Sequence, residues 1–419
     1  MQEMSSTPAD VVVIGAGIVG VMTALELQQS GRSVLLIDRD GPASGCSFGN
    51  GGGIGPNTCI PFALPGILRQ IPKWYLDPDG PVIVNPGWVL RSFPWIWRWL
   101  LSSRESDARR SAKAMQYLYE GCLDSYRSVL GSVLSADLLR EQGYLYVYES
   151  ETPGRGEIFA MALRRELGIP FRQIGSAELR EMEPALSPVF RRATLLPGNG
   201  HTTNPKRLVD ALFERFRTAG GRFSRAEVTG FATENGELCG LTTPEGAVPL
   251  RQVVLCAGVW SGGLAGKLGV RVPLVAERGY HVTYRDSPIR LNHKIMNGSR
   301  GFGATSMETG LQITGTVELA DIAMPPNWDR TEALTRMAEK MFVAPLEGER
   351  SRWMGGRPSL PDSLPVLDRS PRFGNAFLNF GHSHWGLCGA PRSARLVADM
   401  ILGRPLPTAL GAYAWVRFK

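Results

Sequence analysis

One segment near the start of the chain limits its fold more than any other feature. Residues 10–39 read DVVVIGAGIVGVMTALELQQSGRSVLLIDR, and the apolar, β-branched run at 11–14 is typical of a strand buried on both faces of a parallel sheet. Three glycines follow with the spacing GxGxxG: Gly15, Gly17 and Gly20. They allow a tight turn, close approach of the backbone to a pyrophosphate, and close packing of the next helix. A second apolar run ends at Asp38, which can accept hydrogen bonds from ribose, so the segment predicts a βαβ dinucleotide-binding fold.

Two further segments bear on which dinucleotide is bound. The acid at position 38 favours a free ribose hydroxyl, as in FAD or NAD, over a 2′-phosphate. Residues 44–57, SGCSFGNGGGIGPN, have little packing capacity and suit close backbone approach to a ligand, with a flexible surface linker as the alternative. Residues 251–269, RQVVLCAGVWSGGLAGKLG, predict another strand that ends in small residues. A second nucleotide-facing strand far along the chain is expected when a long, extended cofactor crosses the sheet.

Composition restricts the class of protein. A length of 419 residues fits two closely packed domains, and the net charge of +7 is not gathered into a basic stripe, so we expect no nucleic-acid binding. The six cysteines are scattered without a CxxC pair, which argues against a zinc ribbon or iron–sulfur cluster and for a reducing compartment. The first residues lack a signal-peptide pattern. We expect a cytoplasmic protein, with peripheral attachment to the cytoplasmic face of the inner membrane as the alternative.

The chain resembles the D-amino-acid oxidase superfamily of FAD enzymes, and within it the bacterial D-amino-acid dehydrogenases. The similarity covers nearly the whole length. Besides the segments above it includes PFALPG at 61–66, ERGYHVTY at 277–284, GLQITGTVELA at 310–320, WMGGRPSLPDSLPVLD at 353–368 and NAFLNFGHSHWGLCGAPRSARLVADMI at 375–401. The resemblance implies an α/β fold: a Rossmann-like FAD-binding domain of the glutathione-reductase type and a second α+β substrate domain built on an antiparallel sheet. We expect the FAD domain to comprise residues 8–84, 195–272 and 353–419, and the substrate domain residues 85–194 and 273–352.

The resemblance also assigns the residues that hold FAD. The ADP half falls to Gly15, Ala16, Gly17, Ile18, Val19, Gly20, Asp38 and Arg39, and the pyrophosphate and flavin to Ser47, Asn50, Gly51 and Gly52. The adenine would meet the backbone of Val228, and Ala257, Gly258 and Trp260 follow the second strand. The pyrimidine end of the flavin would be closed by Gly381, His382, Ser383, His384, Trp385, Gly386 and Leu387. Cys388 does not match the attachment motif of covalent relatives, so we expect non-covalent FAD.

Substrate binding calls for an arginine, because its guanidinium can bind a carboxylate through two hydrogen bonds. Arg357 is the first candidate, since similar enzymes, glycine oxidase included, place the arginine of a GxRP motif against the substrate carboxylate. A surface or interdomain salt bridge is the alternative. Tyr280 is the second candidate, as an aromatic hydroxyl near the substrate carboxylate; a strand residue packed in the core is the alternative. His382 and His384 suggest polar contacts with flavin or substrate rather than a metal site, since no third ligand accompanies them. His201 is either a pocket residue or an ordinary loop histidine.

These residues predict an FAD-dependent dehydrogenase that oxidises a D-amino acid or a cyclic imino acid such as D-proline or hydroxyproline. Hydride would pass from the α-carbon to flavin N5, an imino acid would form, and a quinone or other acceptor would take the electrons. One alternative is a glycine or sarcosine oxidase that makes hydrogen peroxide. Another is the catalytic subunit of a hetero-oligomeric dehydrogenase whose partner subunits carry iron–sulfur clusters. The tryptophan-rich stretch within residues 85–130 is interpreted as packing over the substrate pocket, with contact to a membrane interface as the alternative.

Overall fold

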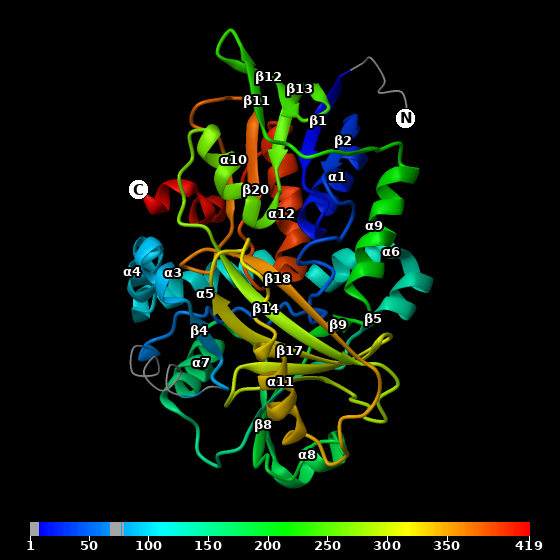
Figure 1. Cartoon of the computed structure of the whole chain (residues 1–419), viewed down its shortest axis with the longest axis vertical. Coiled ribbons are helices and arrows are strands. Elements are labelled where there is room, and N and C mark those ends of the chain that lie inside the picture. The colour runs from blue at the N-terminus through cyan, green and yellow to red at the C-terminus, as the bar shows by residue number, and fades with distance from the viewer. Residues whose placement is uncertain (1–7, 68–76, 78) are drawn as a thin grey trace.

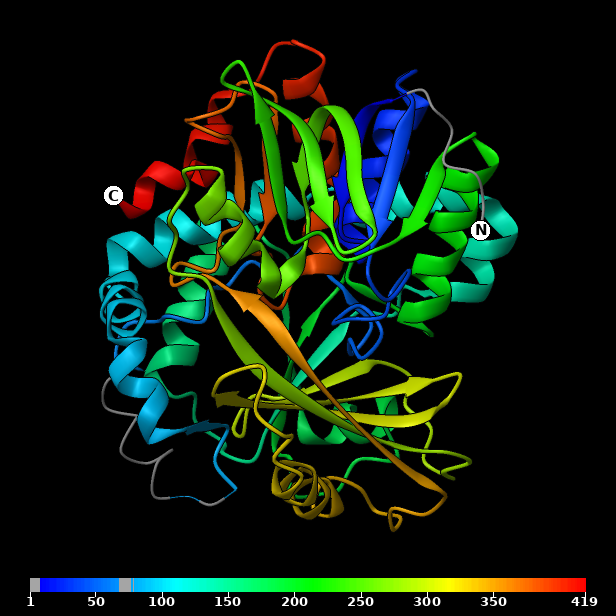
Figure 2. The same cartoon turned by 45° about the horizontal axis from the view of Figure 1, so that its top comes forward.

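The computed structural model describes residues 8–67, 77 and 79–419. Figure 1 shows two parts, an upper one that contains the N-terminal strand and the C-terminal helices and a lower one built on a broad second sheet. Figure 2 shows that the chain passes between the two parts several times, so each part is assembled from distant segments. A small three-stranded sheet joins three segments that are far apart in the sequence: β3 (Gly53–Ile54), β9 (Gly200–Thr202) and β5 (Leu139–Arg140).

The upper part is built on an eight-stranded sheet with a parallel centre. The parallel strands lie in the order β10 (Arg222–Arg225), β2 (Val34–Asp38), β1 (Ala9–Ile14), β13 (Gly246–Leu255) and β20 (Ala376–Phe380). Antiparallel strands extend it: β12 (Glu237–Thr243) on β13, β11 (Gly230–Glu234) on β12 and β19 (Val366–Arg369) on β20. On β1, Val11 and Val13 pack into one hydrophobic core, whereas Val12 and Ile14 pack into another. This burial on both faces explains the unbroken apolar run at 11–14.

Helices cover one face of this sheet. They are α1 (Ile18–Gln29), α5 (Glu105–Tyr119), α6 (Cys122–Leu138), α9 (Pro205–Thr218) and α12 (Gly386–Ile401). On the other face lie α10 (Ser261–Lys267) and the β11–β12 hairpin. The apolar side of α5, with Met115, Leu118 and Tyr119, is buried in the core that α1 and α12 share. Helices α5 and α6, which the predicted division put in the substrate domain with the rest of residues 85–194, thus pack on the upper sheet, and the division of domains itself stays a prediction.

The lower part is a nine-stranded, largely antiparallel sheet. Its order is β18 (Arg350–Ser359), β14 (Val275–Tyr284), β17 (Gly310–Leu319), β16 (Phe302–Met307), β15 (Lys294–Asn297), β6 (Tyr144–Tyr148), β8 (Arg192–Leu196) and β7 (Arg172–Gly175), and β4 (Val82–Val84) pairs with β17. Helices α8 (Ser176–Met182) and α11 (Asp329–Glu339) lie on the outer face, and α7 (Arg155–Glu166) flanks the sheet. The inner face meets the upper part. The predicted α/β fold with a second, antiparallel sheet is confirmed.

The tryptophan-rich stretch forms α3 (Pro86–Arg91) and α4 (Phe93–Ser102). Trp88 and Trp95 are buried against Leu319 of β17, as the packing interpretation predicts. Phe93 and Trp97 of the same stretch are 61% and 54% exposed, so contact with a membrane interface stays a prediction. Within the described residues, no helix is both long and apolar enough to cross a bilayer.

Candidate active site

A deep cleft opens at the carboxyl ends of β1, β2, β13 and β20, and strand β18 of the lower sheet forms its opposite wall. This position is where open α/β sheets bind their ligands. Most residues predicted for the cofactor line it: Gly15, Gly17, Ile18, Val19, Asp38, Arg39, Ser47, Asn50, Val228, Ala257, Gly258, Trp260, Gly381, His382, Ser383, Gly386 and Leu387. Six others belong to the same segments but do not line the cleft: Ala16, Gly20, Gly51, Gly52, His384 and Trp385.

The turn between β1 and α1 has the geometry of a pyrophosphate site. Gly15 has φ +103°, and a Cβ there would lie 2.5 Å from the carbonyl oxygen of Cys256. A Cβ on Gly20 would lie 1.8 Å from the carbonyl oxygen of Gly15, so only glycine lets the helix cross the strand this closely. Gly17 caps α1 without a side chain, and Ser47 Oγ accepts a hydrogen bond from the backbone N–H of Ile18. The helix N-terminus therefore faces the cleft with the partial positive charge that a phosphate requires.

The adenosine end of the cleft combines a carboxylate with a cation on an aromatic ring. Asp38 Oδ2 accepts a 2.7 Å hydrogen bond from the backbone N–H of Ala16, which fixes the carboxylate at the end of β2. The guanidinium carbon of Arg39 lies 4.0 Å from the ring centroid of Trp260. Together with Val228 these side chains border the cleft. The arrangement fits a ribose that donates hydroxyls to Asp38.

The glycine-rich loop lies directly on the inner face of the lower sheet. A Cβ on Gly51 would lie 2.7 Å from the Thr314 side chain, so the loop has no room for larger residues. Beneath it, the buried Lys294 Nζ donates hydrogen bonds to the Gly51 carbonyl oxygen and, at 2.9 Å, to Thr305 Oγ1. Burial lowers the pKa of Lys294 to about 8. No sequence motif marks this lysine, because its position depends on the pairing of distant strands.

Arg357 lies on β18, directly opposite Glu277 of β14, so both side chains project from the inner face of the sheet. The guanidinium covers Gly279, where a Cβ would lie 2.2 Å from its Cζ atom. Its Nη1 donates a 3.3 Å hydrogen bond to the Thr316 carbonyl oxygen. Within the described residues no carboxylate oxygen lies within 4.0 Å of this guanidinium, so the predicted alternative of a salt bridge is not formed there. Burial lowers the pKa of Arg357, opposed by the charge of Glu277, but an arginine keeps its charge.

A carboxylate and an imidazole lie beside Arg357. His384 Nε2 is 2.6 Å from Glu277 Oε2, and the two side chains are only 18% and 9% exposed. Burial would raise the pKa of Glu277, but hydrogen bonding to His384 and the nearby positive charges outweigh it, and the pKa is lowered. Burial, with the charge of Arg357, lowers the pKa of His384. The centroid of the Phe62 ring lies 4.2 Å from that of the His384 ring. The contacts of His384 with Glu277 and with Phe62 were not predicted, although both partners lie in motifs that the sequence analysis recognised.

The remaining candidates lie elsewhere. Tyr280 is on the outer face of β14, where its hydroxyl donates to Glu318 and accepts from the backbone N–H of Asn327, so it lies across the sheet from Arg357. His382 lines the cleft and lies 3.0 Å from Ser393 Oγ, and burial lowers its pKa to about 3. His201 is buried in β9, and burial lowers its pKa to about 3. Both imidazoles are therefore neutral at physiological pH.

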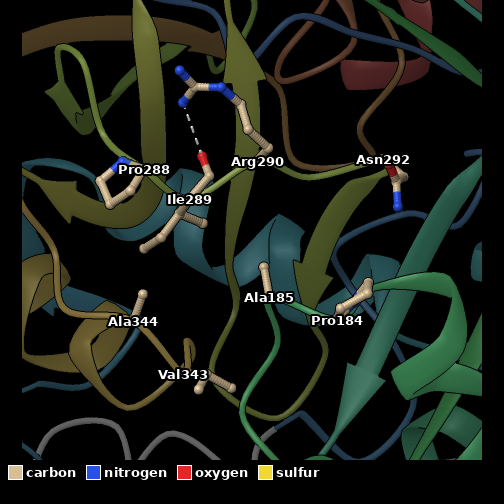
Figure 3. Close-up of a pocket in the computed structure, with 8 residues that line it drawn as sticks. All are labelled: Pro184, Ala185, Pro288, Ile289, Arg290, Asn292, Val343 and Ala344. Atoms are coloured by element: carbon tan, nitrogen blue, oxygen red, sulfur yellow. Dashed lines mark hydrogen bonds between the residues drawn. The ribbon is translucent and has the colours of Figure 1, made fainter.

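A second hollow lies at the outer end of the lower part (Figure 3). Of the eight residues drawn there, Arg290 is the one with a charged side chain, and it donates back to the carbonyl oxygens of Ser287 and Ile289. Beside it His293 Nδ1 lies 2.8 Å from Glu183 Oε1. This hollow has no contact with the dinucleotide cleft, and we assign no chemistry to it.

Comparison with known proteins agrees with this geometry. The profile of the FAD dependent oxidoreductase family matches residues 10–400, nearly the whole chain. The chain belongs to this family. It is therefore an FAD-dependent oxidoreductase, and the predicted cofactor is confirmed.

Two curated relatives and one solved structure show how this oxidoreductase compares with known members. It is 30% identical to a D-amino-acid oxidase of Bradyrhizobium diazoefficiens over 97% of this chain and 98% of that protein. It is 28% identical to a D-amino acid dehydrogenase of the same organism over 94% and 95% of the two chains. Glycine oxidase from Geobacillus kaustophilus has the same fold, with a TM-score of 0.74 at 20% identity over 98% and 99% of the chains. The oxidoreductase is thus an enzyme that acts on amino acids, as predicted.

Proposed function

We propose that this oxidoreductase is a dehydrogenase of D-amino acids or cyclic imino acids such as D-proline or hydroxyproline. The observation that carries the proposal is the guanidinium of Arg357, half-buried beside the cleft and without a carboxylate partner among the described residues. A half-buried cation without such a partner is costly unless a ligand supplies the opposite charge, and a substrate carboxylate would do so. The names of the two curated relatives support the D-configuration.

Each part of the chain has a role in such a reaction. FAD, when bound, supplies the acceptor for the hydride that leaves the α-carbon. Arg357 would hold the carboxylate and so fix the direction in which the α-carbon points. The rings of Phe62 and Trp385, whose centroids are 5.2 Å apart, and of His384 are tilted against one another and form an aromatic cluster on which a pyrrolidine ring would pack.

We further propose that a quinone or another acceptor, rather than oxygen, takes the electrons, and that the enzyme is cytoplasmic. The exposed Phe93 and Trp97 of α4 supply a surface on which it could meet a membrane that contains quinone. Partner subunits stay an alternative. The sequence has no iron–sulfur cluster motif, so in that case a partner subunit that carries a cluster would take the electrons from the flavin.

The test is anaerobic bleaching of the flavin absorbance by paired D- and L-amino acids, with proline, 4-hydroxyproline, glycine and sarcosine included. We expect rapid bleaching by one D-enantiomer of a cyclic imino acid and slow or no bleaching by its L-partner. Bleaching by glycine or sarcosine alone would contradict the proposal. In air, hydrogen peroxide formed in equal amount to substrate consumed would indicate an oxidase instead, and activity that appears only with copurified proteins would indicate a missing subunit.

A further inference from the structure

The contact between Glu277 and His384 determines which ring nitrogen of His384 carries the proton. A carboxylate only accepts hydrogen bonds, so the 2.6 Å contact requires the proton on His384 Nε2. The neutral ring then carries its lone pair on Nδ1. That atom accepts no hydrogen bond from the residues that the structure describes, and it is not sealed off from solvent. A base with a fixed tautomer therefore lies next to Arg357.

We propose that His384 Nδ1 accepts a proton from the substrate ammonium, while Glu277 holds the ring and stabilises the imidazolium that forms. This inference rests on the function proposed above, in which Arg357 binds the carboxylate of the same substrate. In the step, an N–H bond of the ammonium breaks, the proton moves to Nδ1, and the electron pair stays on nitrogen. The imidazolium later releases its proton to water. His384 is then a catalytic residue and Glu277 a positioning residue.

The charges around His384 suit this transfer. The titratable groups that face it are Glu277 from β14 and Arg357 from β18, and Cys46 lies near Arg357 on the side of the glycine-rich loop. The cation of Arg357 disfavours positive charge on the substrate ammonium and on His384 alike, whereas the anion of Glu277 favours the imidazolium that forms. The three side chains together carry no net charge, which matches a zwitterionic amino acid.

A second His–Glu pair provides a matched control. His293 and Glu183 make a similar contact at 2.8 Å, and their chain neighbours Asn292 and Pro184 line the second hollow. The variants are His384→Asn, Glu277→Gln and His293→Asn. For each we would measure FAD content, melting temperature, and the dissociation constant of cyclopentanecarboxylate, which has the carboxylate but no amine.

The decisive measurement is the rate of anaerobic flavin reduction at saturating substrate between pH 6 and 10. In the wild type the rate is expected to change little over most of this range, because the proton is accepted inside the complex. In His384→Asn only substrate already deprotonated in solution reacts, so the rate should fall about tenfold per pH unit below the pKa of the substrate amine. Glu277→Gln should lower the plateau without this slope, and His293→Asn should match the wild type. Cyclopentanecarboxylate should bind all of these variants within about twofold.

Several results would overturn the inference. If His384→Asn folds, holds FAD and keeps the wild-type pH profile, His384 is not the base. If His384→Asn and Glu277→Gln lose cyclopentanecarboxylate binding as strongly as amine turnover, Glu277 and His384 only hold Arg357 in position for the carboxylate. These outcomes leave the proposed function intact. A wild-type flavin that no amino acid reduces and that cyclopentanecarboxylate does not perturb would instead remove the proposed function, and the inference with it.

Discussion

Replacing Arg357 by alanine removes the group on which the proposed substrate site depends. The guanidinium makes a single long hydrogen bond within the described protein, 3.3 Å to the Thr316 carbonyl oxygen, so most of its donors are left for a ligand. A hydrogen bond to a charged group contributes about 1.5–3 kcal/mol, and two such bonds to a carboxylate give about 3–6 kcal/mol. We therefore expect kcat/KM for an amino acid to fall by about a hundredfold to ten-thousandfold.

The assay for Arg357→Ala is anaerobic flavin reduction by the best substrate, compared with reduction by the matching amine that lacks the carboxylate. The loss should appear for the amino acid and be small for the amine. Arg352→Ala is the control on the same strand, because that side chain is 43% exposed and lies 3.8 Å from Glu332 at the surface. Unchanged kcat/KM for the amino acid in a folded, FAD-loaded Arg357→Ala protein would refute the role of this residue.

Three further substitutions test the framework around the site. Gly20→Ala places a methyl group against the Gly15 carbonyl, so we expect a lower melting temperature and loss of FAD during gel filtration. Lys294 has a folded pKa of about 8, below its ordinary 10.5, so the unfolded chain binds more protons in this interval and stability should rise with pH through it. Urea unfolding should show that rise, on the order of 3 kcal/mol, in the wild type relative to Lys294→Met. Tyr280→Phe leaves the buried carboxylate of Glu318 short of a donor and should cost about 1–3 kcal/mol in unfolding free energy, with KM unchanged.

The nucleotide-binding half could be predicted because its determinants are local. Gly15 and Gly20 of the fingerprint each have a steric reason, against the residue that follows a neighbouring strand or within a few residues, as the 2.5 Å approach of a Gly15 Cβ to Cys256 illustrates. The apolar run of β1 needs only the rule that a central parallel strand is buried on both faces. Asp38 follows from the end of the next strand. None of these inferences requires the position of the lower sheet.

The substrate end could be predicted only in part, since its geometry depends on strand register. Arg357 was found through its motif, but its neighbour Glu277 follows from the pairing of β18 with β14, whose residues lie some eighty positions apart in the chain. Lys294 reaches the glycine-rich loop because β15 pairs with β6 and β16. The orientation of α4 buries Trp95 and exposes Trp97, and the composition of the segment does not specify that orientation.

The segment ERGYHVTY explains why the predicted Tyr280 lies away from the site and why Glu277 was missed, because successive side chains of a strand point to opposite faces of the sheet. Glu277 and His281 face the upper part, where they contact His384 and the glycine-rich loop. Arg278 and Tyr280 face α11, where both contact Glu318 in a buried polar cluster. That cluster fixes the orientation of β14, since a slip of one residue would bury Glu277 in the apolar outer core and turn Arg278 toward the substrate. Arg278, Tyr280 and Glu318, which lie away from the cleft, therefore determine that Glu277 faces the substrate site.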